Sequence, residues 1–216
     1  NADFMDIRNH LDQKPYDGHE AVEFIIREAR KERQQKLVLL PVGKLTNIAL
    51  ALKKAPDIKD KVRIVWLGSN YPNPGEYNLE NDIPAMNYIL NQEAPFEIVT
   101  VRYNGNTGAT AVRVTPSEME KHMPGAGPLS DSVEGRHGGH FTRFGDYSIN
   151  LFQHVELYGD PPSRSLYDVV AVAIVKKPEW GQKQVIPAPI MDTTDHTWQK
   201  RPDNTRSIIL WENFDK

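Results

Sequence analysis

An alternation of short apolar runs with amphipathic segments constrains the fold more than any other feature of this chain. Residues 37–42 (LVLLPV), 62–67 (VRIVWL) and 96–101 (FEIVTV) each have the length and composition of a buried strand. Residues 19–30 and 46–55, which precede and follow the first run, place apolar side chains at helical spacing. A polar loop is expected over residues 68–81, after the second run, and Asp82 is a candidate N-cap for the helix that follows it. Because such alternation favours parallel strands joined by right-handed crossovers, we predict an α/β fold with an open, mostly parallel sheet flanked by helices.

The second half of the chain has a less regular pattern. Residues 124–148 are rich in glycine and predict a mobile loop, and helices are expected near residues 149–158 and 167–175. Three segments near the C-terminal end predict strands, with a small hairpin and an edge strand among them: residues 185–191 (VIPAPIM), 196–201 (HTWQKR) and 206–214 (RSIILWENF). Pro187 and Pro189 keep the first of these segments away from a central position, because proline has no N–H to donate to a sheet.

The length and composition limit the classes of protein to which this chain can belong. A chain of 216 residues can form one domain with a buried core, and we expect a single domain over residues 1–216. The formal net charge of −3 gives no basic excess that would favour a nucleic-acid partner. The absence of cysteine excludes disulfides, thiolate nucleophiles and cysteine-based zinc sites. No apolar stretch approaches the roughly 20 residues that span a bilayer, so we expect a soluble protein with no membrane partner, either cytoplasmic or periplasmic.

Three short segments contain the candidate functional residues of this chain. They are residues 41–49 (PVGKLTNIA), residues 75–78 (GEYN) and residues 167–173 (YDVVAVA). Each also has a simpler explanation: a strand–glycine–helix junction, a solvated polar loop, and a helix capped by Asp168. The first two segments follow predicted strands, and open parallel sheets bind ligands beyond the carboxyl ends of their strands. Their order along the chain is more specific than any one of them.

In that order, the three segments resemble the inosine–uridine-preferring nucleoside hydrolase family. The family patterns are PxGPLTNIA, EFN followed by a D-P-E-A-A helix start, and D-x-x-A-V-A. Here Lys44 replaces the usual proline, Tyr77 replaces phenylalanine and Ile83-Pro84 replaces Pro-Glu. The resemblance runs from about Glu20 to the C-terminal end. It implies a Rossmann-like nucleoside hydrolase fold, an enzyme of purine and pyrimidine salvage, and hydrolysis of the N-glycosidic bond of ribonucleosides to ribose and free base.

The resemblance also implies a role for individual residues. Asp168 and the backbone carbonyl of Val42 match ligands of a calcium ion, a hard cation that prefers oxygen. Glu76 and Asn78 match residues that hydrogen-bond the ribose hydroxyls and stabilise charge developing on the sugar, and Asn70 matches a contact near its 5′ end. The implied reaction is attack of a calcium-bound water on the anomeric carbon through an oxocarbenium-like transition state.

The leaving-group side of the expected site is less defined. Tyr167 occupies the position where the best-known branch of the family has a histidine that protonates the departing base. Tyrosine is a poor general acid at neutral pH, so stacking on the nucleobase and simple core packing both stay open. In residues 136–140 (RHGGH), the two glycines favour a loop over a metal-binding helix. The resemblance implies a lid here, with His140 contacting the base.

One family motif has no counterpart in this sequence. Members begin with a strand ending in D-x-D-x-x-x-D-D, which supplies two calcium ligands and the general base. Asp3 and Asp6 do not reproduce that spacing. Because calcium affinity follows the number and charge of its ligands, we expect the N-terminal part of the fold to be missing and this chain alone to be an incompetent hydrolase. An N-terminal segment of the same protein is then a possible partner.

Two other interpretations stay open at this point. The chain could be a catalytically inactive relative that binds a nucleoside or a sugar. It could also be a glycosidase built on two carboxylates, but no acid with convincing spacing accompanies Glu76. A homo-oligomer is possible by analogy with the family, and the preferred nucleobase is left open.

Overall fold

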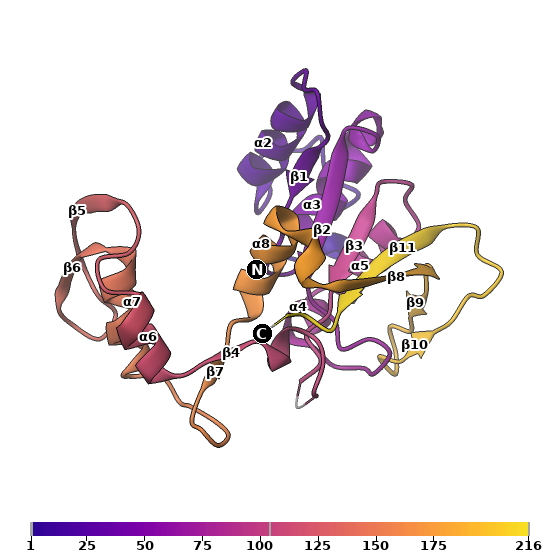
Figure 1. Ribbon diagram of the computed structural model, residues 1–216. Coiled ribbons are helices and arrows are strands. Elements are labelled where there is room, and N and C mark those ends of the chain that lie inside the picture. Colours follow the sequence, from indigo (N-terminus) through magenta and orange to yellow (C-terminus); the bar gives the residue numbers. More distant parts are fainter. Residues whose placement is uncertain (1, 104, 216) are drawn as a thin grey trace. The chain divides into compact units, whose positions relative to one another are not determined.

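The computed structural model describes residues 2–103 and 105–215 (Figure 1). Residues 1, 104 and 216 lie outside the described residues. The chain divides into two compact units, one formed by Asn1–Ala111 with Tyr167–Asp215 and the other by Val112–Leu166. Each unit is described by itself below, and a single domain over residues 1–216 stays a prediction.

The larger unit is built on a five-stranded sheet with the order β1-β2-β3-β11-β8. Its strands are β1 (Leu37–Leu39), β2 (Val62–Leu67), β3 (Phe96–Val99), β11 (Ser207–Glu212) and β8 (Gln182–Pro187). The first four run parallel and β8 pairs antiparallel with β11. The predicted mostly parallel sheet flanked by helices is therefore confirmed, and the proline-containing segment is an edge strand, as expected.

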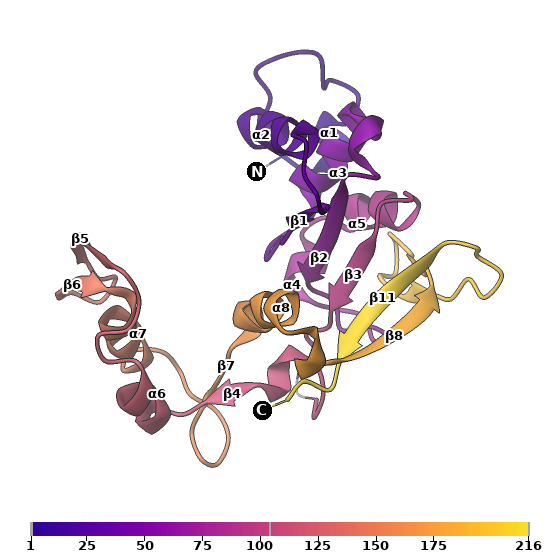
Figure 2. The same cartoon turned by 45° about the horizontal axis from the view of Figure 1, so that its top comes forward.

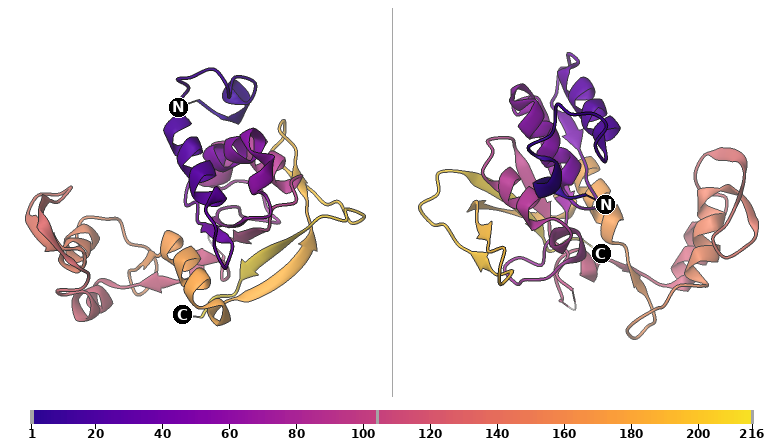
Figure 3. Two further views of the ribbon diagram at one scale, coloured as in Figure 1. Left: turned by 90° about the horizontal axis from the view of Figure 1, so that it is seen from above. Right: turned by 180° about the vertical axis from the view of Figure 1, so that it is seen from behind.

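Helices flank both faces of this sheet (Figure 3). The face that carries Ile64 and Ile98 packs into the main hydrophobic core. The helices that supply buried side chains to this core are α1 (Phe4–Ile7), α2 (His19–Arg30), α3 (Thr46–Lys54) and α5 (Ile83–Leu90). Since successive strand residues point to opposite faces, Val65 and Leu67 belong to the other face, where α8 (Tyr167–Lys176) contacts β2.

Local sequence explains the boundaries of these helices. In α2, Val22, Ile26 and Ala29 are buried along one side of the helix. α5 begins after Asp82, whose carboxylate accepts a hydrogen bond from the backbone N–H of Ala85 at 3.0 Å, as the sequence predicted. Among the described residues, no helix is both long enough and apolar enough to cross a bilayer.

Short elements complete the larger unit. A four-residue helix, α4 (Tyr77–Glu80), lies within the stretch expected to be a plain loop. The expected small hairpin is formed by β9 (Ile190–Met191) and β10 (Trp198–Gln199). Single turns of 3-10 helix occur at η1 (Pro56–Ile58), η2 (Ala109–Ala111) and η3 (Pro178–Trp180).

The smaller unit contains more regular structure than its sequence predicts. It consists of paired strands β4 (Arg113–Val114) and β7 (Arg164–Ser165), helix α6 (Pro116–His122), a hairpin of β5 (Leu129–Glu134) and β6 (His140–Arg143), and helix α7 (Phe144–Phe152). The prediction of a loop over residues 124–148 is therefore wrong, and the helix expected at 149–158 begins earlier. Gly145 explains the error, because it suggests a loop but allows α7 to approach the Met123 carbonyl closely: a Cβ there would lie 1.9 Å from that oxygen.

Candidate functional site

The loop that follows β2 is folded around the buried carboxylate of Glu76, which is only 3% exposed. Its oxygens accept hydrogen bonds from the backbone N–H groups of Ser69 at 2.8 Å, Asn78 at 2.9 Å and Leu79 at 2.9 Å. Two of these donors belong to the first turn of α4, so Glu76 is the N-cap of that helix. A single side chain thus closes the loop and starts the helix.

Asn70 and Tyr103 tie this loop to the end of β3. The side-chain oxygen of Asn70 accepts a hydrogen bond from the backbone N–H of Tyr103 at 3.1 Å, and its amide nitrogen donates to the Gly75 carbonyl. Burial raises the pKa of the Tyr103 hydroxyl, and the negative charge of Glu76 raises it further. The segments after β2 and β3 therefore form one connected structure.

Asn78 lies at the carboxyl end of β2. Its side-chain nitrogen donates a hydrogen bond to the carbonyl of Leu67, the last residue of that strand, at 3.0 Å. An amide side chain has two N–H donors and one acceptor oxygen. The bond to Leu67 thus leaves Asn78 with capacity to bind a hydroxyl group.

The start of α8 is joined to the same region through two tyrosine rings. The rings of Tyr167 and Tyr103 meet edge to face, with their centroids 6.0 Å apart. Thr110 donates a hydrogen bond to the Tyr167 hydroxyl at 3.3 Å. Because Tyr103 also donates its backbone N–H to Asn70, Tyr167 and the neighbouring Asp168 belong to the same end of the sheet as the loop after β2. Figure 2 shows α4 and α8 near the ends of β2 and β3.

Asp168 lies in the first turn of α8 and is exposed to solvent. Although its side chain is accessible, the surrounding protein displaces part of its hydration, and this burial raises the pKa of the carboxyl group. A cation bound nearby would have the opposite effect, since it favours the charged carboxylate. The start of a helix also favours negative charge.

The turn after β1 is fastened to the end of β2. The Pro41 carbonyl accepts a hydrogen bond from the Leu67 N–H at 3.1 Å, and the Gly43 carbonyl accepts one from the Trp66 indole at 2.9 Å. Val42 lies between these two anchors and is exposed. The structure therefore associates all three sequence motifs with the carboxyl ends of the parallel strands.

The described residues do not make a calcium site by themselves. Nowhere in 2–103 or 105–215 do three or more histidine, cysteine, aspartate or glutamate side chains cluster so that they could hold a metal ion. Asp168 and the Val42 carbonyl would supply two oxygens, whereas calcium takes about 6–8. A complete site would need ligands from elsewhere.

His140 lies on β6 of the smaller unit, apart from the six other predicted site residues, which all belong to the larger unit. Its contact with a nucleobase stays a prediction. The structure adds three polar residues that the motifs did not indicate: Ser69, Tyr103 and Thr110. Position alone could have pointed to Ser69 and Tyr103, because each follows a predicted strand at its carboxyl end.

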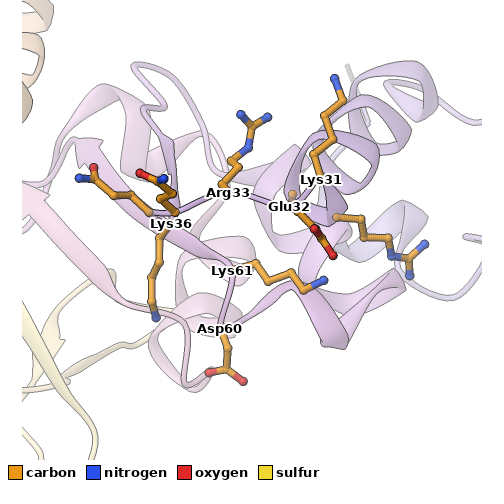
Figure 4. A pocket seen from close by; sticks show the side chains of 10 residues that line it. Lys31, Glu32, Arg33, Lys36, Asp60 and Lys61 are labelled. Carbon is orange, nitrogen blue, oxygen red and sulfur yellow. The ribbon is translucent and has the colours of Figure 1, made fainter.

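A surface pocket lies at the opposite end of the sheet, before β1 and β2 (Figure 4). It has a volume of about 440 Å³ and is lined by residues 29–36 with Asp60 and Lys61. The side chains of Arg33, Lys36 and Lys61 point in different directions. This pocket therefore presents scattered charge, without groups that converge on a ligand.

Residues 4–209 match the family model described as inosine-uridine preferring nucleoside hydrolase. The chain belongs to this family. The inosine-uridine preferring nucleoside hydrolase of Leishmania major is 33% identical over 82 residues, which are 35% of this chain and 26% of the relative. An uncharacterized protein from Schizosaccharomyces pombe is 29% identical over 124 residues, or 54% of this chain and 39% of the relative.

A solved structure supports the fold assignment. The inosine-uridine preferring nucleoside hydrolase of Bacillus anthracis superposes with a TM-score of 0.63 at 20% identity, covering 90% of this chain and 61% of that protein. This nucleoside hydrolase family member thus spans about three fifths of the length of the solved structure that it resembles. Its matches to the two curated relatives span less than half of their length.

Proposed function

We propose that this chain provides the sugar-binding side of a ribonucleoside hydrolase, which cleaves the N-glycosidic bond to release ribose and a free base. Family membership supports hydrolysis of this kind. The observation that carries the proposal is the connection from Tyr167 through the Tyr103 ring and the Tyr103 N–H to Asn70 of the loop after β2. It associates Asn78, with its spare hydrogen-bonding capacity, and Asp168 with the carboxyl ends of the strands, where open parallel sheets bind ligands.

Among the polar residues of the loop, we assign the direct sugar contact to Asn78. Its amide can both donate to and accept from a ribose hydroxyl. Glu76 and Asn70 act as positioning residues instead, because their polar atoms already bind the backbone of the loop. By holding the start of α4, they fix the place of Asn78 and would contribute to catalysis through it.

The base side of the site is assigned to Tyr167. Tyr167 presents a ring that can stack on a nucleobase, and its edge-to-face contact with Tyr103 fixes the orientation of that ring. This assignment does not require the Tyr167 hydroxyl to act as an acid.

The residues of this chain support a role in substrate binding more strongly than a role in cleaving the glycosidic bond. Asp168 and the Val42 carbonyl would contribute two ligands to a calcium ion whose remaining ligands come from an aspartate-rich segment. Because the described residues do not complete that site, we assign no catalytic step to a metal. The same observation favours a second candidate function for this chain on its own: a nucleoside-binding protein without hydrolytic activity.

The decisive experiment measures binding and hydrolysis separately. Titration calorimetry with inosine, uridine and ribose should detect binding. Asn78→Ala should weaken the affinity by about tenfold, which corresponds to a loss of roughly 1.4 kcal/mol from the missing hydrogen bonds. Asn81→Ala is the matched control, since Asn81 follows the same short helix and donates only to the Tyr77 carbonyl. Equal loss in both variants, or no binding to any of the three compounds, would contradict the proposal.

Hydrolysis is followed by the release of reducing sugar from inosine, with and without EDTA. We expect no release by this chain alone. We expect EDTA-sensitive release when an aspartate-rich N-terminal segment from a family member is supplied. Release by the chain alone would show that its own residues are sufficient and would reject the proposed need for further ligands.

A further inference from the structure

The sheet face that packs into the main core continues onto β8 and opens there into a surface pocket. Ile186 of β8 lies opposite Ile208 of β11, and Gln184 lies opposite Leu210. Ile208 and Leu210 are buried in the core, whereas Ile186 packs against it and is only half-buried. The pocket has a volume of about 380 Å³, and Ile186 and Leu210 are part of its lining. This volume lies within the range of about 300–1,000 Å³ that is typical of small-molecule sites.

One wall of this pocket is formed by Tyr71, which the surrounding residues hold in place. The Tyr71 N–H donates to the Ser69 hydroxyl at 2.9 Å, and the Tyr71 carbonyl accepts from Nε of Arg102 at 3.2 Å. The Tyr71 ring meets the ring of Trp198 edge to face, with their centroids 5.3 Å apart. A wall held in this way loses little freedom when a ligand binds, so the pocket is preformed on this side.

The opposite wall is the segment 200–202, which follows the β9–β10 hairpin beside β8 (Figure 1, Figure 2). Arg201 holds this segment in place. Its guanidinium donates to the carbonyls of Ala188 and Pro189, both at 2.9 Å, and to the side-chain oxygen of Asn91 at 2.8 Å. All three acceptors are neutral, so these bonds fix the side chain and leave its positive charge uncompensated.

The charged groups of the pocket have one sign. Among the described residues that line it, Arg102, Lys200 and Arg201 are cationic and none is acidic. Arg102 forms an ion pair with Glu212. The ion pairs within the described part of the chain include neither Lys200 nor Arg201, and Lys200 is exposed. The pocket before β1 and β2 differs, because acidic and basic residues both line it.

We propose that this pocket binds an aromatic anion, a planar ring system that carries one carboxylate or sulfonate. The ring would lie over Ile186 and against Tyr71, and three prolines of the lining add flat apolar surface: Pro72, Pro187 and Pro202. The acidic group would pair with Lys200, and the charge of Arg201 would add to the local positive potential. Apolar walls with a few placed polar groups are the usual composition of a small-molecule site.

This pocket is separate from the proposed substrate site. Neither Asn78 nor Tyr167 is part of its lining. The inference rests on the shape and charge of the pocket and does not depend on the proposed hydrolysis.

The test is a fluorescence titration of the full chain with 8-anilinonaphthalene-1-sulfonate, an aromatic anion whose emission rises in an apolar site. The uncharged N-phenyl-1-naphthylamine has the same rings without the sulfonate and is the control probe. We expect both probes to bind. Added salt should weaken the binding of the sulfonate and leave that of the uncharged probe unchanged, because salt screens only the charged contact.

A charge reversal tests the ion pair. Lys200→Glu should weaken the binding of the sulfonate about tenfold, because it replaces an attraction by a repulsion. The uncharged probe should bind this variant within about twofold of the original chain. Lys183→Glu is the matched control, since Lys183 is an exposed lysine of β8 that does not line the pocket. It should leave the affinity for both probes within about twofold of the original chain.

A second pair of variants tests the apolar surface. Ile186→Asn should weaken the binding of both probes several-fold. Val185→Asn should affect neither, because successive strand residues point to opposite faces and Val185 is 64% exposed outside the pocket. Thermal melting confirms that each variant is folded. If Ile186→Asn does not fold, Lys200→Glu still decides the outcome, since Lys200 is exposed.

Absence of binding, or equal weakening of the sulfonate by Lys200→Glu and Lys183→Glu, would overturn the proposal. Displacement of the sulfonate by inosine would assign this pocket to the substrate and would also reject a separate site. Asn78→Ala should bind the sulfonate with unchanged affinity. Failure of this proposal can therefore be distinguished from failure of the proposed function.

Discussion

Two segments with similar composition, residues 68–78 and residues 124–143, adopt very different structures. Both contain several glycines and prolines, and both are expected from sequence to be loops. The first is built around Glu76, which is buried and accepts three backbone hydrogen bonds. The second contains the β5–β6 hairpin, in which every residue of β5 is exposed and Leu129 is 71% exposed.

A buried acceptor, and not composition, orders a loop of this kind. A carboxylate can satisfy several backbone N–H groups at once, and each of them would otherwise be costly to bury. The hairpin is held by the strand ladder, by the hydrogen bond from Ser130 to the Thr142 carbonyl and by ring contacts such as that between Phe141 and Tyr147, and all residues of β5 are exposed. The first segment is therefore expected to unfold with the core, and the hairpin locally.

Replacing the central carboxylate has the largest expected effect. Glu76→Ala leaves the N–H groups of Ser69, Asn78 and Leu79 without their acceptor in a buried position. We expect the free energy of unfolding to fall by about 3 kcal/mol, measured by urea denaturation.

The matched control for this prediction is Glu134→Ala on the exposed strand β5. A surface substitution of this kind should change the free energy of unfolding by less than about 0.5 kcal/mol. Glu76→Gln keeps one acceptor oxygen, so its effect on the free energy of unfolding should lie between those of the two alanine variants. If both alanine variants behaved alike, the buried carboxylate would not be what distinguishes the two segments.

The sequence predicts the regular parts of the fold well. Periodicity places α2 at its observed bounds, and the apolar run at 62–67 matches β2. The Asp82 cap is also predicted, because aspartate is a common N-cap and the helix after it is strongly apolar. In these cases the information is local, so a short window of sequence contains it.

The parts that were missed depend on contacts between distant residues. Glu76 is an unusual N-cap type, and its role depends on Ser69 being brought to it by the turn after β2. Likewise, the connection from Tyr103 to Tyr167 joins the end of β3 to the start of α8. Motif order indicated which segments meet, but the side chains that join them are set by packing.

Two glycine substitutions sharpen the comparison with nearly matched chemistry. Gly75 has φ 73° and Gly138 has φ 83°, and a Cβ at either position would meet no atom within 4 Å. The cost of alanine is therefore backbone strain alone, roughly 1 kcal/mol at each site. Because every tryptophan lies in the larger unit, at positions 66, 180, 198 and 211, fluorescence reports only on that unit.

We expect Gly75→Ala to lower the tryptophan-monitored stability by about 1 kcal/mol, and Gly138→Ala to leave it unchanged. The second variant should instead increase proteolytic cleavage within the hairpin. Equal fluorescence shifts would mean that the two segments unfold together, which would remove the distinction between them.

The smallest expected effect concerns Asp168, a second carboxylate near the loop of residues 68–78. Burial raises the pKa of the Asp168 carboxyl group. Folding disfavours its charged form, so the penalty is full above its folded pKa and disappears as the pH falls to the ordinary aspartate pKa of 3.8. Asp168→Asn should therefore raise the free energy of unfolding at pH 7 by less than about 1 kcal/mol, since solvent screens this accessible group, and the gain should vanish near pH 4.

Glu23 is expected to show a stability change of the opposite sign, because hydrogen bonds from Lys14 and Lys54 lower its pKa to about 2. Glu23→Gln should thus be destabilising at pH 7, with an effect that declines as the pH falls from 4.5 toward 2. Urea denaturation of both variants across this range checks the two signs, and a pH-independent effect of Asp168→Asn would show that lost helix-terminal charge, and not burial, governs this carboxylate.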